Sequence, residues 1–112
     1  MRALLLFLLM ALPGPAEPHR IASQRRPIRF AEGQAQGARW MLECRDMWDA
    51  MEEDGGVYFE IVNTTEEARQ QVRDILGKPN DVRLLGVYDL NIELTPQGPG
   101  LTATQFLALK SR

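Results

Sequence analysis

Residues 57–89 have the sequence VYFEIVNTTEEARQQVRDILGKPNDVRLLGVYD, in which two strand patterns flank one helical pattern. Residues 57–62 are rich in β-branched and aromatic side chains and follow two glycines, a pattern typical of a strand. Residues 82–89 predict a second strand for the same reason. Gly86 within the second strand indicates a bulge or a bend, because a glycine in a strand interior weakens regular pairing.

The segment between the two strands predicts a helix that begins near Thr64. Thr64 and Glu67 have the spacing of a capping box, in which a hydroxyl and a carboxylate satisfy the free N–H groups of the first turn. Gly77 ends the helix, and Pro79 prevents its continuation. The apolar face of this helix is formed by Ala68, Val72, Ile75 and Leu76.

Upstream of residue 57, the segment 38–53 is predicted to be another helix. Its apolar residues recur at helical spacing, at positions 40, 41, 44, 47, 48 and 51. A strand over the same residues is the alternative, but alternation fails at Asp46 and the segment has poor strand formers. The run Asp54-Gly55-Gly56 stops the helix, since glycine readily adopts the left-handed conformation.

Downstream of residue 89, short strands are expected at 92–94 and at 101–109, separated by a loop rich in proline and glycine. Thr102 and Gln105 offer an alternative for the last segment, because they have the spacing to cap a short helix. The fold class is therefore α+β, with two helices packed on a mostly antiparallel sheet of 3–5 strands. From residue 57 onward the order of elements is also similar to the second half of an OB-type barrel, which implies a small barrel as the alternative.

The first 16 residues have the features of a cleavable signal peptide. Arg2 provides the positive start, and residues 3–12 form an uncharged apolar run. Such a run is too short to span a bilayer, which takes about 20 helical residues. Small residues at Gly14 and Ala16 place the cleavage site after residue 16. We expect export to the periplasm or the extracellular space with no membrane span after cleavage; retention as a membrane anchor through residues 3–12 is the alternative.

Residues 17–37 are expected to form a flexible basic arm that precedes a domain at 38–112. The arm contains four arginines, two prolines and few apolar residues, whereas the chain from residue 31 onward has 8 basic and 14 acidic residues. Arginines in a mobile segment can bind phosphates of nucleic acid or an anionic surface, with affinity that falls steeply with salt. The candidate anion-binding residues are Arg20, Arg25, Arg26 and Arg29.

The sequence offers little for catalysis or metal binding. Cys44 is the single cysteine, and its apolar neighbours predict a buried, unreactive thiol. His19 is the single histidine and lies in the expected arm, so no catalytic or zinc-binding set can be assembled. The acidic run 52–54 is interpreted as a solvated helix end. We therefore assign no catalytic, cofactor or metal residue and predict that the chain is not an enzyme; Asn63 begins a glycosylation sequon that also fits a helix cap.

A stripe of tryptophan and methionine side chains is the remaining functional candidate. Such residues either belong to the core or provide an adaptable binding surface. The candidate partner-binding residues are Trp40, Met47, Trp48 and Met51. Our first hypothesis is an exported, non-enzymatic interaction or accessory module that binds another protein or a second copy of itself. The alternative is a small OB-like module that binds a ligand or a polyanion through the arginines.

The signal-peptide hypothesis makes a direct prediction about the mature protein. Protein expressed in its native host and fractionated should have an intact mass that corresponds to a chain beginning at Glu17, and it should occur in the exported fraction. A full-length mass in the cytosolic or membrane fraction would contradict cleavage and export.

Overall fold

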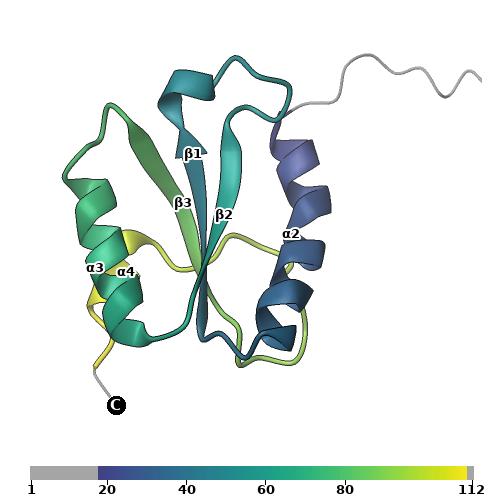
Figure 1. Ribbon diagram of the computed structural model, residues 1–112, viewed down its shortest axis with the longest axis vertical. Coiled ribbons are helices and arrows are strands. Elements are labelled where there is room, and N and C mark those ends of the chain that lie inside the picture. Colours follow the sequence, from purple (N-terminus) through teal and green to yellow (C-terminus); the bar gives the residue numbers. More distant parts are fainter. Residues whose placement is uncertain (1–17, 111–112) are drawn as a thin grey trace, which may run out of the picture.

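The computed structural model describes residues 18–110, and Figure 1 shows their arrangement. The elements in chain order are α2 (Pro18–Ala35), β1 (Trp40–Asp46), the short 3₁₀ helix η1 (Met47–Asp49), β2 (Val57–Val62), α3 (Thr65–Leu76), β3 (Val82–Asp89) and α4 (Ala103–Leu107). The three strands form one sheet in the order β2-β1-β3, and β1 is antiparallel to both neighbours. The expected α+β class with a small antiparallel sheet is confirmed.

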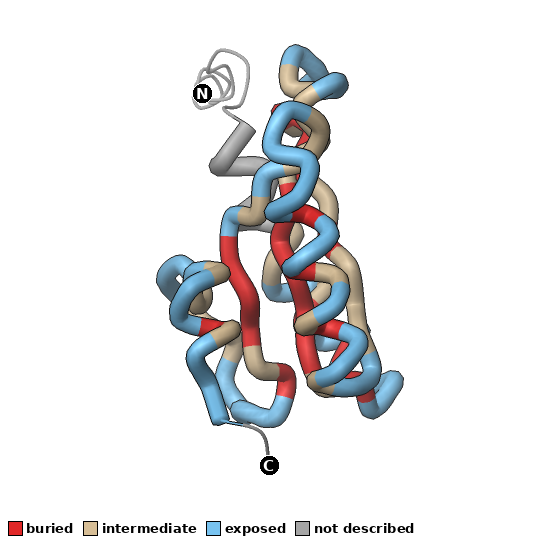
Figure 2. Tube along the Cα trace, turned by 90° about the vertical axis from the view of Figure 1, so that its left-hand side faces the viewer, coloured by how far each residue is buried: buried red, intermediate tan, exposed pale blue. Residues whose placement is uncertain are grey.

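The sheet is covered on both faces, so the described chain has three layers. Helix α2 lies on one side of the strands, and α3 and α4 lie on the other (Figure 1). Helix α3 connects β2 to β3 across the central strand. The tube view shows the buried residues concentrated along the strands between these layers (Figure 2). The two faces of β1 therefore both lie in hydrophobic cores.

Each face of the sheet has its own cluster of buried side chains. The cluster beneath α2 is formed by Phe30, Ala38, Met41, Val57, Phe59, Tyr88 and Leu90. The cluster beneath α3 and α4 is formed by Trp40, Leu42, Cys44, Ala68, Val72, Ile75, Val87 and Phe106. Alternate residues of β1 enter opposite clusters, as the period of two in a strand requires. The side chains of β1 thus join the two cores through the sheet.

The helix expected at 38–53 is wrong, because residues 40–46 form the central strand. A strand buried on both faces is apolar at nearly every position, so it does not show the usual alternation. Its apolar residues then also fit a helical period. Helical structure in this region is limited to η1, and a turn follows it. Gly55 and Gly56 do adopt positive φ, at 68° and 78°, but they close this turn rather than a helix.

The flexible arm expected at 17–37 is also wrong over residues 18–35, which form α2. Phe30 on this helix is only 1% exposed and belongs to the cluster on that face. Gly33 allows the close approach of the helix to the sheet, because a Cβ there would lie 2.7 Å from a methyl group of Leu90. The packed domain consequently begins before residue 38. The predicted signal peptide at 1–16 lies outside the described residues.

Most of the predictions for residues 57–89 are confirmed. Both strands and the helix are present, and the Thr64 hydroxyl accepts a hydrogen bond from the Glu67 N–H at 3.1 Å. The register of β1 against β3 shifts opposite Gly86, as a bulge requires. Leu76 is the exception to the predicted apolar face, because it is exposed while Ala68, Val72 and Ile75 are buried.

Two predictions downstream of β3 need correction. Residues 92–94 form a bend rather than a strand, and residues 103–107 form the short helix α4. The helix alternative is confirmed by its capping box, in which Thr102 and Gln105 exchange hydrogen bonds. The OB-like barrel is wrong, because the described strands form an open three-stranded sheet. Within residues 18–110, no helix has the length and hydropathy needed to cross a membrane.

The packing of α2 can be tested by substitution of Phe30. Phe30→Ala is expected to lower the free energy of unfolding by about 3–5 kcal/mol, because it leaves a cavity in the core. Ile28 lies on the same helix and is exposed. Ile28→Ala should therefore change the free energy of unfolding by less than about 0.5 kcal/mol. Urea denaturation measures both. Small and equal effects would contradict the packing of α2.

Candidate protein-binding surface

Two large apolar side chains lie at the tip of the hairpin that joins β1 to β2. Trp48 is 79% exposed and Met51 is 97% exposed. Trp48 is nevertheless held in place, since its ring N–H donates to Asp81 Oδ1 at 2.9 Å and its backbone N–H donates to Asp46 Oδ1 at 3.0 Å. A tryptophan that is ordered and exposed loses little conformational entropy on binding, which favours a contact surface.

A hollow with acidic walls adjoins this hairpin tip. Its volume is about 930 Å³, and it extends to the start of β2. Its carboxylates come from Asp46, Asp49, Glu52, Glu53 and Asp54. Arg25 of α2 is the single basic residue among its walls, and its guanidinium lies 3.3 Å from Asp54 Oδ2. The hollow therefore has a marked excess of negative charge; we call this feature the acidic hollow.

The candidate partner-binding residues divide between core and surface. Trp40 is buried: it packs edge-on against Phe106 with ring centroids 4.8 Å apart, and its indole N–H donates to the Thr65 hydroxyl at 2.9 Å. Met47 is half-buried. Trp48 and Met51 are therefore the two candidates that a partner can contact. The sequence spacing alone grouped Trp48 and Met51 with Trp40 on one helical face. In the structure β1 ends at Asp46, so Trp40 lies in the strand and the other two lie in the hairpin beyond it.

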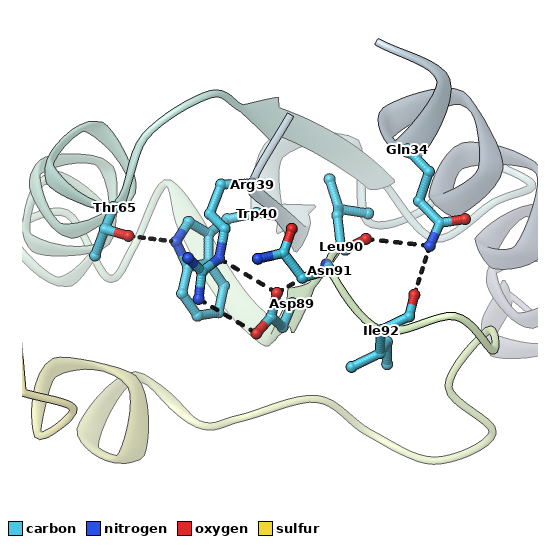
Figure 3. A network of polar contacts seen from close by, with 8 residues as sticks. All are labelled: Gln34, Arg39, Trp40, Thr65, Asp89, Leu90, Asn91 and Ile92. Atoms are coloured by element: carbon cyan, nitrogen blue, oxygen red, sulfur yellow. Dashed lines mark hydrogen bonds and ion pairs between the residues drawn. The ribbon is translucent and has the colours of Figure 1, made fainter. Parts of the chain in front are cut away.

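The surroundings of Trp40 form a polar network at the other end of the sheet (Figure 3). The Arg39 guanidinium lies over the Trp40 ring, 4.8 Å from its centroid, and pairs with Asp89 at 3.3 Å. In the same view, the Gln34 side-chain amide donates to the backbone oxygens of Leu90 and Ile92. These bonds attach α2 and the segment after β3 to the sheet, which is a structural role.

The arginines expected to bind anions have carboxylate partners within the protein. Arg25 pairs with Asp54, Arg26 pairs with Glu43, and Arg29 pairs with Glu32 on the same helix. Arg20 lies in α2, and its side chain is outside the described part of the structure. Arg25 and Arg26 thus attach α2 to the rest of the domain, whereas the Arg29 pair lies within the helix. All three described arginines have a carboxylate partner, which does not favour the anion-binding hypothesis.

The pair between Arg26 and Glu43 is the main polar contact of the α2 interface. Glu43 is buried in β1, where its carboxylate accepts a hydrogen bond from Arg26 Nε at 3.2 Å and from the Tyr88 hydroxyl at 2.8 Å. Burial and the hydrogen bond to Glu43 raise the pKa of Tyr88 to about 12. This network was not predicted from the sequence, although a carboxylate within an apolar stretch indicates that the carboxylate needs a buried partner.

The single cysteine is poorly placed to act as a nucleophile. Cys44 is a free cysteine in the centre of β1 and is fully buried, as expected. Burial, together with the charge of Glu60, raises the pKa of its thiol to about 12, so the nucleophilic thiolate is scarce at neutral pH. Among the described residues, no group of three or more histidine, cysteine or acidic side chains converges in a way that could hold a metal ion.

The network around Glu43 predicts strongly non-additive effects on stability. Glu43→Gln should lower the free energy of unfolding by about 3 kcal/mol, because the Arg26 charge stays partly buried without its counter-charge. The triple variant R26M/E43L/Y88F replaces all three polar groups by apolar ones and should cost much less. Chemical denaturation checks both variants. A triple variant that is as unstable as Glu43→Gln would contradict this account.

Comparisons with protein-family models, with curated proteins and with solved structures find no match for this chain.

Proposed function

We propose that this chain is an exported, non-enzymatic interaction module that binds a basic surface of another protein through its β1–β2 hairpin. The observation that carries the proposal is the exposed pair Trp48 and Met51 beside the acidic hollow, with Trp48 held in place by hydrogen bonds. Apolar anchors bordered by charge are typical of binding sites in which a few residues supply most of the affinity.

The charge of the hairpin region supports a basic partner. The acidic hollow has five carboxylates and one arginine, and that arginine already pairs with Asp54. A partner with lysine or arginine side chains would be steered toward this surface, and association would slow as salt screens the attraction. A protein with acidic side chains, or a nucleic acid with its negative phosphates, would be repelled from the same surface.

The hairpin is also mechanically suited to present these side chains. The Asp46 side chain caps η1 through the Trp48 N–H, and Gly56 closes the turn with its N–H donated to Asp54 Oδ1 at 2.9 Å. The hairpin therefore projects from the central and edge strands as a closed loop with internal hydrogen bonds. Preorganisation of this kind lowers the entropic cost of binding.

The proposed location outside the cytoplasm depends on the N-terminal sequence. The charged start, the apolar run at 3–12 and the small residues before position 17 support cleavage and export. A single cysteine buried at the centre of the domain is compatible with an oxidising compartment, because an inaccessible thiol does not form bridges with other chains.

The function can be tested by selection from a random peptide library displayed on phage, with the mature protein as bait. Selected peptides are expected to be enriched in lysine or arginine together with apolar residues. The double variant W48A/M51A should bind them at least about 30-fold more weakly, as expected for loss of a binding hot spot of about 2 kcal/mol. Calorimetric titration at low and high salt measures the affinities.

Leu94→Ala provides the matched control, because Leu94 is 81% exposed but lies in the loop after β3. This variant should bind as tightly as the unmodified protein. Selected peptides without basic residues, or equal losses for the control and the double variant, would contradict the proposed surface.

A further inference from the structure

Strand β2 has an edge that the described part of the chain leaves open. It pairs with β1 on one side, through hydrogen bonds that include Arg39 N–H to the Val62 oxygen at 3.1 Å and Asp46 N–H to the Gly56 oxygen at 2.8 Å. In an antiparallel ladder, alternate residues direct their N–H and C=O groups to the same side. The backbone groups of Phe59 and Ile61 therefore point away from β1.

Outward backbone groups elsewhere in the sheet, at Val57 and Val87, already have partners. The Val57 oxygen, at the same side of β2, accepts a hydrogen bond from Arg25 at 3.2 Å. On the opposite edge of the sheet, Val87 exchanges two backbone hydrogen bonds with Leu101, at 2.8 and 2.9 Å. Within residues 18–110, no such backbone partner lies against Phe59 or Ile61. Phe59 as a whole is only 7% exposed, because its side chain lies in the core, whereas Ile61 is half-buried. The edge section that lacks a described backbone partner is therefore short, and it is centred on these two residues.

The surface beside this open edge is hollowed and acidic. A hollow of about 430 Å³ extends along β2 toward α3 and is lined by the carboxylates of Glu60 and Glu67 and by side-chain amides. The amides belong to Asn63, Gln70 and Gln71. At the other end of β2, Val57 and Tyr58 border the acidic hollow. Carboxylates therefore flank the open section of backbone at both ends.

We propose that the β2 edge adds an extended, cationic segment of the partner protein as a fourth strand. The segment would pair with the N–H and C=O groups of Phe59 and Ile61 and place lysine or arginine side chains near Glu60, Glu67 and the acidic hollow. This inference rests on the proposed function and specifies how the basic partner binds. Main-chain hydrogen bonds provide affinity in this mode, and alternate side chains provide specificity.

The charges on β2 favour such a partner over a second copy of this chain. In the antiparallel register that pairs Phe59 with Ile61 of a second copy, the two Glu60 side chains lie directly opposite each other. Like charges in this position are destabilising, whereas a lysine opposite Glu60 is favourable. Homodimerisation through β2 is therefore an alternative outcome of the test below.

The probe for the test is a seven-residue synthetic peptide of alternating lysine and valine. At saturating peptide, the amide protons of Phe59 and Ile61 should exchange with solvent at least about tenfold more slowly in NMR measurements, because they become hydrogen-bonded. The same peptide N-methylated on alternate residues cannot form the ladder, and it should bind at least about tenfold more weakly. Glu60→Gln should weaken binding of the unmodified peptide by about two- to fivefold, while Glu93→Gln, an exposed change after β3, should leave it unchanged.

The outcomes separate this inference from the proposed function. Binding that W48A/M51A abolishes, without slower exchange at Phe59 and Ile61, would overturn strand addition and leave the hairpin proposal intact. Slower exchange at these amides with unchanged affinity of W48A/M51A would support strand addition and contradict the hairpin. Equal affinity for the N-methylated peptide, or no binding of either peptide, would overturn strand addition. A dimer in sedimentation equilibrium that protects these amides without peptide would also overturn it.

Discussion

The burial of β1 on both faces is the constraint on which the rest of the structure depends. A three-stranded sheet this small has one central strand, and its side chains enter one core beneath α2 and another beneath α3 and α4. Each core needs a helical cover, since an uncovered face would expose the apolar residues of β1 to water. The position of Glu43 in this strand then requires a buried cation and a hydroxyl, which Arg26 and Tyr88 supply.

The need to neutralise the Glu43 carboxylate gives the basic residues of α2 a structural role. Arg25 and Arg26 pair with carboxylates of the sheet and its hairpin, and they lie over the rings of Phe59 and Tyr88, at 5.7 and 5.3 Å from the ring centroids. Their stems and planar head groups cover apolar surface while their charges are neutralised locally. The basic residues thus attach α2, and the acidic surplus of the chain remains available around the β1–β2 hairpin and along β2.

The proposed hairpin surface and the proposed β2 edge each adjoin a hollow that contains carboxylates, and they would offer a partner two kinds of contact. Trp48 and Met51 offer apolar area, whereas the backbone of Phe59 and Ile61 offers directional hydrogen bonds. Both are supported by a sheet whose central strand is packed from two sides. In the proposed binding mode, a rigid support of this kind would keep the contact groups in position before a partner arrives and would lower the ordering cost of association.

Local sequence patterns by themselves determined the two strands and the helix of residues 57–89, because residue preference, period and capping residues there all indicate the same elements. They also determined the burial of Cys44, since an apolar neighbourhood predicts a buried thiol in a helix and a strand alike. Only the tertiary structure decided that 40–46 is a strand and 18–35 a packed helix. A segment covered on both faces has no polar face to set its period, and a basic helix is stabilised by carboxylates far away in sequence. The tertiary structure also decided that Trp48 faces solvent while Trp40 is buried. Trp40 lies in β1 between the two covering layers, whereas Trp48 lies beyond the end of the strand.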